Sequence, residues 1–507
     1  MILTITFHKS PKIKADTAIV AVFKDNRLTA SAEKLDRLHG GIIKHHLKKQ
    51  HKFKGRKDQF LVIAAPRDSD YARIILMGLG DPDKLGNETC EHGGGRLYLT
   101  LSGASAVRAQ FFMDEEAGKM TAEDIAARIA MGVRLRCYKF DKYRSKPKKE
   151  DESADLETLE FVTSAAPRAG AIFSNFEHVA AGMFLARNLV NEPPNELYPD
   201  SFARIIRDEL TPLGVEVEIF DEKKMAKLGF HAHLAVGMGS ARPPRVVVMR
   251  WNGGGKAKAK SKQGPLAFVG KGVTFDTGGI NIKPSAGLED MKLDMGGAAA
   301  VVGLMKTLAL RKSKAHVVGI AGLAENMPSH TAYRPSDILK SLSGKTIEVM
   351  NTDAEGRLIL ADSLTYIQRT YKPRLIVDLA TLTGAMMVAL GYDYCGTFVN
   401  NDDLWAKLDA AGKESLENLW RMPLHESYKK DMESKIADVR SLGGMGRYAG
   451  ACTAAGFLEH FIEGNTPWAH MDIAGTAWIG ADKPTCPRPG TGFGVRVLDR
   501  LIAANYE

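Results

Sequence analysis

The chain contains few cysteines and lacks a long apolar run, and each absence excludes a class of protein. Its five cysteines form no C-x-x-C pair and are widely scattered, at Cys90, Cys137, Cys395, Cys452 and Cys486. An odd, dispersed set argues against a disulfide framework or a thiolate zinc site, and it fits a reducing compartment. No stretch of about 18 uninterrupted apolar residues occurs, so no membrane span is predicted. The N-terminal MILTITFHKSPKIKAD has no apolar core typical of a secretory signal, and we therefore expect a cytoplasmic protein.

The net charge of +9 comes from three basic windows. Residues 41–57, 142–149 and 256–262 contain seven, five and four lysines or arginines and no acidic residue, so the remainder of the chain is net acidic. Charge runs of this kind are most often solvated loops or helix faces. They leave nucleic-acid binding open as an alternative or second role, although no recognised nucleic-acid motif accompanies them.

The first 165 residues alternate short β-rich runs with helical patterns, which is typical of a small α/β domain. A helix is predicted over 122–138, where Ile125, Ile129 and Val133 would share one face. The β-rich runs lie at 2–7, 17–23, 59–63, 74–77 and 96–101.

The second half of the chain has a stronger pattern of short apolar runs separated by helical stretches. The runs at 266–270, 317–321, 346–350 and 375–379 alternate with predicted helices at 296–311 and 355–370. Near-continuous apolar strands with intervening helices predict a mostly parallel sheet flanked by helices on both faces. Ligands of such sheets bind beyond the carboxyl ends of the strands.

Domain boundaries follow from the segments between these two patterns. The charged segment 143–156 has no periodicity and is predicted to be a surface loop, and a long helix over 168–191 ends at the turn-rich NEPPNELYP. We predict a smaller N-terminal α/β domain over 1–167, a linker helix and turn over 168–195, and a larger C-terminal α/β catalytic domain over 196–507.

Several acidic and basic residues fall in the loops after the predicted strands. The segments VGKGVTFDTGGINIKPSAGLEDMKLD (269–294) and NTDAEGRL (351–358) contain Asp276, Asp294, Asp353 and Glu355, together with Lys271, Lys283 and Arg357. Four carboxylates at one edge of a sheet would repel one another strongly at low dielectric, and two divalent metal ions would neutralise them. Any one of these acids taken alone is more readily a helix cap or a turn residue, whereas the set of four favours a metal site. The glycine-rich loop matches neither phosphate-binding fingerprint.

A cysteine-based mechanism is not favoured. Nothing in the sequence brings Cys452 and His470 together as a nucleophile and base, and we expect both to be buried structural residues.

These motifs resemble the leucyl aminopeptidase family of cytosolic dinuclear metallopeptidases, whose signature is NTDAEGRL. VGKGVTFDTGG at 269–279 is similar to the family's other signature segment. The resemblance covers about residues 180–500 and includes the following stretches: NEPPN at 191–195, TLTGA at 381–385, GACTAAGFLEHF at 450–461, WAHMDIAG at 468–475 and TGFGVR at 491–496.

The resemblance implies a metal-ligand set and a mechanism. Asp276 and Glu355 would contact both metals, Asp353 would complete one site, and Lys271 and Asp294 would complete the other. Zinc, manganese, magnesium or cobalt would suit such carboxylate-rich ligation. The metals would activate a water to remove the N-terminal residue of a peptide with a free amine. Lys283 would stabilise the developing oxyanion, and Arg357 would hold a bicarbonate ion as general base.

The resemblance also implies a specificity and an assembly. Met291, Thr381 and Gly384 correspond to residues that line the pocket for the first side chain, which would prefer Leu or Met but remain broad. Members of the family form homohexamers, and some relatives also bind DNA.

Overall fold

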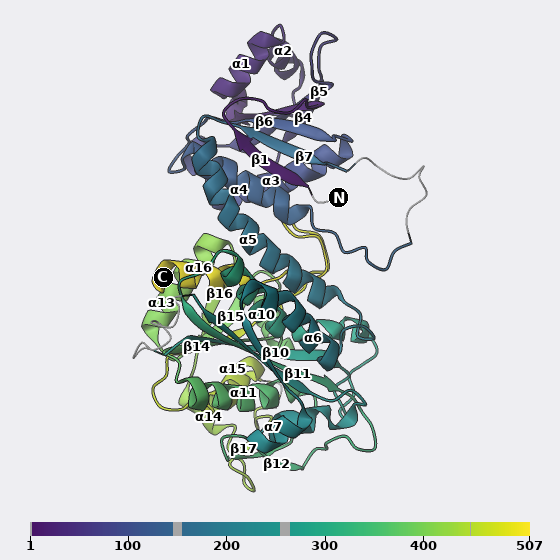
Figure 1. Ribbon diagram of the computed structural model, residues 1–507, viewed down its shortest axis with the longest axis vertical. Coiled ribbons are helices and arrows are strands. Elements are labelled where there is room, and N and C mark those ends of the chain that lie inside the picture. Colours follow the sequence, from purple (N-terminus) through teal and green to yellow (C-terminus); the bar gives the residue numbers. More distant parts are fainter. Residues whose placement is uncertain (1–2, 146–154, 254–263, 447) are drawn as a thin grey trace. The chain divides into compact units, whose positions relative to one another are not determined.

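The computed structural model describes residues 3–145, 155–253, 264–446 and 448–507. The basic window 256–262, and residues 146–149 of the second window, lie outside the described residues. The chain divides into two compact units (Figure 1). The first consists of Met1–Ala180 with Asp482–Pro487, and the second of Ala181–Ala481 with Arg488–Glu507. Helix α5 (Ala166–Asn191) begins in the first unit and ends in the second.

The first unit is built on one twisted sheet with the strand order β1-β7-β6-β2-β5-β4, and β3 pairs with β2. Adjacent strands are parallel except at β4 and β3. The strands are β1 (Thr4–His8), β2 (Thr17–Phe23), β3 (Arg27–Leu28), β4 (Phe60–Ala64), β5 (Arg73–Gly80), β6 (Arg108–Phe112) and β7 (Thr158–Val162). The helices are α1 (Ala30–Leu38), α2 (Ile42–Lys49), α3 (Asn87–Gly103) and α4 (Ala122–Arg136).

Strand β2 shows why this sheet is covered on both faces. Every residue of the strand is buried, and successive side chains of a strand point to opposite faces. Ile19 and Ala21 therefore pack into the core that contains residues of α3 and α4. Val20 and Val22 pack into a second core with residues of α1 and α2. The predicted α/β architecture is confirmed.

The expectation of a strand at 96–101 is wrong, because these residues belong to α3. Leu97, Leu99 and Leu101 recur at every second position, which suggested a strand. In the structure Leu97 and Leu101 are fully buried whereas Leu99 is 46% exposed. Burial four residues apart is the helical period, and the leucine alternation was coincidental.

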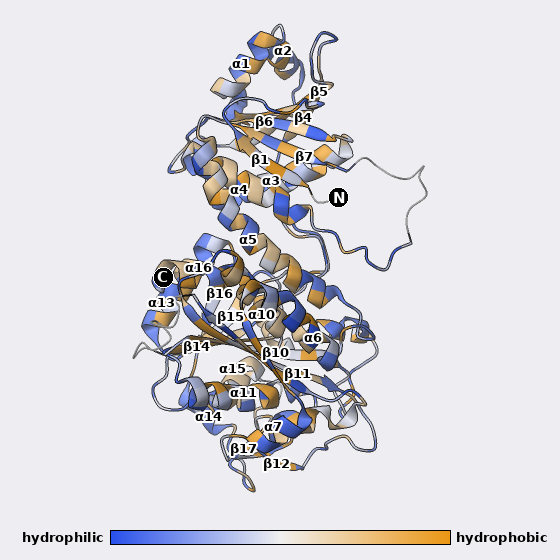
Figure 2. Cartoon of the chain, in the orientation of Figure 1, coloured by the Kyte–Doolittle hydropathy of each residue, from blue (hydrophilic) through white to orange (hydrophobic). Residues whose placement is uncertain are grey.

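The second unit contains an eight-stranded sheet with the order β16-β15-β18-β14-β10-β11-β9-β8. Its centre, β18-β14-β10-β11, is parallel. The strands are β8 (Glu216–Phe220), β9 (Arg245–Asn252), β10 (Leu266–Asp276), β11 (His316–Asn326), β14 (Leu375–Ala380), β15 (Cys395–Val399), β16 (Leu419–Met422) and β18 (Trp468–Asp472). Figure 2 shows hydrophobic residues along β10 and β14, as expected for strands covered on both faces.

Helices pack on both faces of this sheet. They are α6 (Pro199–Leu210), α7 (Glu222–Leu228), α8 (His231–Val236), α10 (Gly296–Leu310), α11 (Glu355–Tyr371), α12 (Gly384–Leu390), α13 (Asp402–Ser415), α14 (Glu426–Lys430), α15 (Gly450–Glu459) and α16 (Val495–Asn505). A short 3-10 segment, η6 (Leu288–Met295), leads directly into α10. The stretch Leu288–Leu310 is long and apolar enough to cross a membrane by composition alone, but 83% of its most apolar window is buried inside the protein, as in a core helix.

One predicted strand of the second unit belongs to a different sheet. The run at 346–350 forms β13 (Thr346–Glu348), which pairs with β12 (Ile338–Lys340) and β17 (Val439–Arg440) in a separate three-stranded sheet. The expectation that it joins the parallel sheet is therefore wrong. Only its central residue, Ile347, is buried, whereas the strands of the parallel centre are buried along nearly their whole length.

Candidate metal centre

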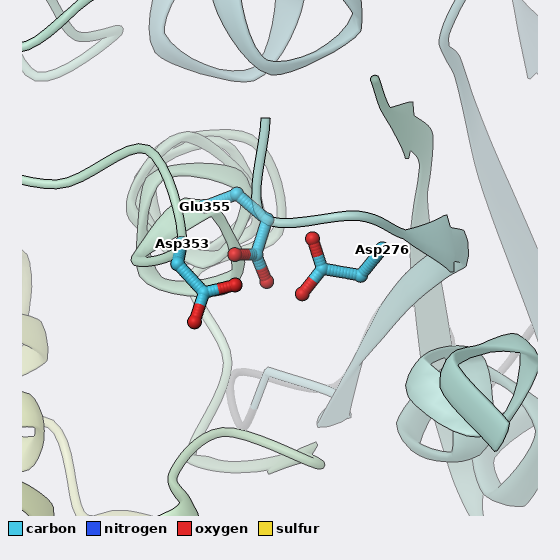
Figure 3. A group of neighbouring side chains, drawn as sticks. All are labelled: Asp276, Asp353 and Glu355. Carbon is cyan, nitrogen blue, oxygen red and sulfur yellow. The ribbon is translucent and has the colours of Figure 1, made fainter. Parts of the chain in front are cut away.

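Three carboxylates from two separate segments converge at the carboxyl ends of the central strands. Asp276 is the last residue of β10, Asp353 lies in the loop that precedes α11, and Glu355 is the first residue of that helix. One oxygen of each lies within 4.8 Å of the others, and Figure 3 shows the three groups pointing toward a common space. The predicted edge of the sheet is therefore where these acids meet.

The turn after β10 brings Asp276 to this space. The pairing of β10 with β11 shifts register between Val273 and Asp276, which bends the end of the strand. The chain then reverses through Gly278 and Gly279, whose φ angles are +87° and +67°. A Cβ on Gly279 would lie 2.8 Å from Asn326 Oδ1 and 2.9 Å from Thr352 Oγ1, so only glycine fits this approach.

Lys271 forms the buried side of the cluster. Its Nζ donates to Asp294 Oδ1 at 2.7 Å and to the carbonyl oxygen of Thr381 at 2.8 Å, and it lies 2.8 Å from Glu355 Oε1. The side chain is only 2% exposed. Helix α11 can approach this amine because Gly356 has no Cβ, which would otherwise lie 2.8 Å from Nζ.

Lys283 forms the accessible side of the cluster. Its Nζ lies 2.9 Å from Asp276 Oδ2 and also pairs with Asp353 Oδ1. Its side chain is 21% exposed, so this ammonium can face both the carboxylates and a ligand.

The cluster holds several carboxyl groups close together in a buried, low-dielectric environment. Burial is the largest cause that raises the pKa of Asp294, Asp353 and Glu355 above their ordinary values; the neighbouring carboxylates raise it further, and the neighbouring lysines oppose the shift. Burial lowers the pKa of Lys271 and Lys283, but the surrounding carboxylates raise it more, so the net shift of both lysines is upward. Such a site favours added positive charge.

The donor set fits a divalent cation. Asp294 Oδ2 and Glu355 Oε2 are buried and accept no hydrogen bond from the described residues. A buried carboxylate oxygen without a partner is costly, and coordination of a cation is one way to satisfy it. Carboxylate oxygens with one amine suit magnesium, manganese or zinc rather than soft metals.

Arg357 follows Glu355 on the first turn of α11 and is also buried. Its Nη1 donates to the carbonyl oxygen of Ser441 at 2.8 Å, whereas its buried Nε has no partner among the described residues. Burial lowers the pKa of this guanidinium to about 10. A buried cation with a free donor is suited to an anion.

A cavity of about 1010 Å³ opens onto the cluster. The sequence-predicted residues all line it: Lys271, Asp276, Lys283, Met291, Asp294, Asp353, Glu355, Arg357, Thr381 and Gly384. Apolar residues such as Met387 and Met422 also line the cavity.

Two polar residues of this region were missed from the sequence. Asn326 ends β11 and donates to Asp276 Oδ1. Asp472 ends β18, and it accepts hydrogen bonds from Leu382 N and Thr383 Oγ1 in the loop after β14. Position in the chain could have indicated both residues, since each is the last residue of a strand whose carboxyl end lies at the same edge of the sheet.

Cys452 and His470 take no part in the cluster. His470 is fully buried on β18, where its Nδ1 lies 2.6 Å from Asp378 Oδ1. Cys452 lines the cavity, but burial raises the pKa of its thiol, which disfavours the nucleophilic thiolate.

Comparisons with known proteins show the family to which the chain belongs. Residues 184–499 match the model of the cytosol aminopeptidase family, catalytic domain, and residues 19–147 match that of the N-terminal domain of the same family. A probable cytosol aminopeptidase of Rhizobium etli is 47% identical over 505 residues, covering 99% of both chains. A probable cytosol aminopeptidase of Nitrobacter winogradskyi is 48% identical over 90% of this chain and 89% of its own.

Solved structures show the same fold. A mutant of tomato leucine aminopeptidase superposes with a TM-score of 0.86 at 33% identity, covering 99% of this chain and 97% of its own. The bottromycin maturation enzyme BotP in complex with Mn superposes with a TM-score of 0.83 at 31% identity, covering 97% of this chain and 100% of its own.

Proposed function

Because this chain belongs to the cytosol aminopeptidase family and is a metal-dependent aminopeptidase, we propose that its reaction centre is the cluster described above. The convergence of Asp276, Asp353 and Glu355 within 4.8 Å at the end of a large cavity carries this assignment. Neither the family models nor the relatives support the alternative of a nucleic-acid-binding protein.

Two divalent cations would be held by the four carboxylates and Lys271. Asp276 and Glu355 would contact both cations, Asp353 would complete one site, and Lys271 with Asp294 would complete the other. Zinc or manganese is proposed for this pair, with magnesium or cobalt also suited to the oxygen-rich donors. When bound, the cations would lower the pKa of a water and polarise the scissile carbonyl.

The two lysines would have different roles because their surroundings differ. Lys271 is enclosed by acceptors on all sides and can ligate only as a neutral amine, so its proton must leave before it binds a cation. Lys283 is partly exposed to the cavity and would keep its charge. Its ammonium would donate to the substrate carbonyl oxygen, where negative charge grows in the transition state.

Arg357 would hold a bicarbonate ion. Its place on the cavity wall supports this role, as does its Nε, which has no partner in the described part of the chain. Bicarbonate at this position would serve as the general base, and the guanidinium would keep the anion in place.

The substrate class is peptides with a free N-terminus. Met291, Thr381 and Gly384 would border the first side chain, and the apolar wall favours Leu or Met there. One methylene is worth only about 1–3 kcal/mol, so the preference should be broad. A homohexamer in the cytoplasm is proposed from the family resemblance, and sedimentation would test the assembly.

A leucyl-amide assay combined with metal analysis tests this proposal. The wild type should hydrolyse leucyl amide, lose activity with a chelator and regain it with Zn²⁺ or Mn²⁺, and leave N-acetyl-leucyl amide intact. Asp353→Asn should lose both bound metal and activity. Asp403→Asn removes an exposed carboxylate on α13 that pairs with Lys407, and it should retain both. Full activity of Asp353→Asn, or of exhaustively metal-depleted wild type, would contradict the proposal.

A further inference from the structure

Asn326 joins the two loops that carry the clustered carboxylates. It is the last residue of β11 and is fully buried. Its Nδ2 donates both to Asp276 Oδ1 at 2.8 Å and to the carbonyl oxygen of Thr352 at 3.0 Å. Thr352 directly precedes Asp353. One side-chain amide therefore connects the end of β10 to the loop before α11.

The orientation of this amide is determined by its partners. Both neighbouring groups are acceptors, so the NH₂ group and not the oxygen must face them. Asn326 Oδ1 is consequently left buried without a partner among the described residues. This oxygen carries a free-energy cost that the two donated hydrogen bonds offset.

The bond from Asn326 gives the two oxygens of Asp276 different roles. Oδ1 accepts from Asn326 Nδ2 and from the backbone N–H of Gly278, at 2.8 and 2.9 Å. Oδ2 faces Lys283 Nζ at 2.9 Å, on the cluster side. The carboxylate is thus anchored through one oxygen and presents the other.

The second loop has additional anchors that do not involve Asp276. Tyr333 donates its hydroxyl to the carbonyl oxygen of Thr352 at 2.7 Å, and Thr352 Oγ1 donates to the carbonyl oxygen of Gly278 at 2.6 Å. Burial raises the pKa of Tyr333 well above its ordinary value, so this phenol remains a donor. Removing Tyr333's bond would therefore disturb Thr352 without touching Asp276.

We propose that Asn326 is a positioning residue for cation binding: it aims Asp276 Oδ2 into the cluster and sets the distance between Asp276 and Asp353. This inference rests on the proposed function, in which these carboxylates hold the cations. Hydrogen bonds to metal-ligating carboxylates fix their orientation, and the loss of one typically lowers metal affinity by about 10- to 100-fold.

Titration with Co²⁺ tests the proposal, because its visible absorption reports coordination geometry as well as occupancy. Asn326→Ala should bind Co²⁺ about 10- to 100-fold more weakly than the wild type and should show an altered spectrum. Wild-type affinity with a wild-type spectrum would overturn the assignment.

The matched control is Gln368→Ala. Gln368 is also a buried amide, and its Nε2 donates to the carbonyl oxygens of Leu364 and Phe461. It lies more than three turns along α11 from Glu355. This variant should lose thermal stability as Asn326→Ala does, yet keep the wild-type Co²⁺ affinity and spectrum. A Gln368→Ala variant that weakens Co²⁺ binding equally would show that general destabilisation explains both results, and it would overturn the proposal.

Two further variants separate the bonds made by the amide. Asn326→Leu keeps the side-chain volume and has no hydrogen-bond donor, so it should also bind Co²⁺ more weakly. Unchanged or tighter binding would overturn the proposal, including where Asn326→Ala does not fold. Tyr333→Phe should keep Co²⁺ affinity within about threefold, since outer contacts that miss the ligand matter less. A loss of Co²⁺ affinity as large as that of Asn326→Ala would show that the hydrogen bonds to Thr352 control cation binding. It would overturn the proposal that Asn326 aims Asp276 Oδ2.

Failure of this inference is distinguishable from failure of the proposed function. Asp276→Asn should abolish tight Co²⁺ binding if the carboxylates hold the cation. If Asp276→Asn loses binding but Asn326→Ala does not, only the positioning role is wrong. If Asp276→Asn binds Co²⁺ like the wild type, the proposed cation site itself is wrong and the positioning role falls with it.

Discussion

Buried carboxylates of two kinds occur in the second unit, and they differ in whether the fold satisfies their oxygens. Asp362 on α11 accepts from the backbone N–H groups of Leu342 and His233, at 2.7 and 2.9 Å. Glu417 accepts from the N–H groups of Gly494 and Val497 near the start of α16. In Asp294 and Glu355, by contrast, one oxygen has no hydrogen-bond donor among the described residues.

Acids whose oxygens accept from backbone N–H groups stabilise the fold, whereas acids with a free buried oxygen are candidates for ligand binding. Burial raises the pKa of Asp362 and of Glu417 to about 7 in spite of their backbone donors. These two groups connect segments distant in sequence and need nothing further. Asp294 Oδ2 and Glu355 Oε2, by contrast, accept no hydrogen bond from the described residues, and the cation of the proposed site would satisfy them.

The largest expected effect is at an acid of the second kind. Glu355→Gln preserves the shape of the side chain but removes one negative charge from the cluster and replaces one acceptor oxygen with an NH₂ group. Loss of a residue that we propose as a direct ligand should exceed the cost of losing an outer contact, so leucyl-amide hydrolysis should fall by at least about 100-fold. The thermal unfolding midpoint should change little, because a buried charge has been removed together with its repulsions.

Metal content measured on the same preparation distinguishes the cause of that loss. Glu355→Gln should contain less bound metal after equilibration with limiting Zn²⁺ or Mn²⁺. Wild-type activity of Glu355→Gln would show that a buried oxygen without a partner does not indicate function here. It would contradict the distinction between the two kinds of acid.

An acid of the first kind should give the opposite pattern. Asp362→Asn places an NH₂ group or a single oxygen against two backbone donors, so one N–H loses its partner. The free energy of unfolding should fall by about 1–3 kcal/mol, as measured by urea denaturation. Activity per folded molecule should remain at the wild-type level. A catalytic loss comparable to that of Glu355→Gln would place Asp362 in the reaction centre and remove the distinction.

The sequence predicted the acids of the cluster but neither Asp362 nor Glu417. Asp276, Asp294, Asp353 and Glu355 were found because they fall after apolar runs and within family-like motifs. Asp362 lies in the middle of a helical pattern, and its backbone partners come from segments whose proximity no local pattern reveals. Asn326 was missed for the same reason, since its role depends on which strand lies beside β10.

The two wrong predictions about the fold also rested on local patterns, which carry no information about tertiary contacts. Leu97, Leu99 and Leu101 alternate as in a strand, yet α3 buries only the first and the last. The run at 346–350 has strand character, but its short length and half-exposed face place β13 outside the parallel sheet. Strand type was predictable in that case, and sheet membership was not, because membership depends on long-range pairing.

The smallest expected effect is the pH dependence of cation affinity, which also tests how the two kinds of acid are charged. The pKa of Glu355, Asp294 and Asp353 is raised in the folded protein, first by burial, and that of Lys271 is raised by the carboxylates around it. Each of these groups must be free of its proton to bind a cation, so affinity for Mn²⁺ should increase with pH, by up to about tenfold per unit for each proton released. Calorimetric titration in two buffers of different ionisation enthalpy would count those protons.

The pH affects the stability contributed by Asp362 in the opposite direction. The folded-state pKa of Asp362 lies above its unfolded value, so its stabilising contribution is present at low pH and is lost as the pH rises through about 7. Asp362→Asn should therefore flatten the dependence of unfolding free energy on pH while leaving the proton count of Mn²⁺ binding unchanged. If the variant altered that count, Asp362 would be electrostatically part of the cluster, and the two kinds of buried acid would be one system.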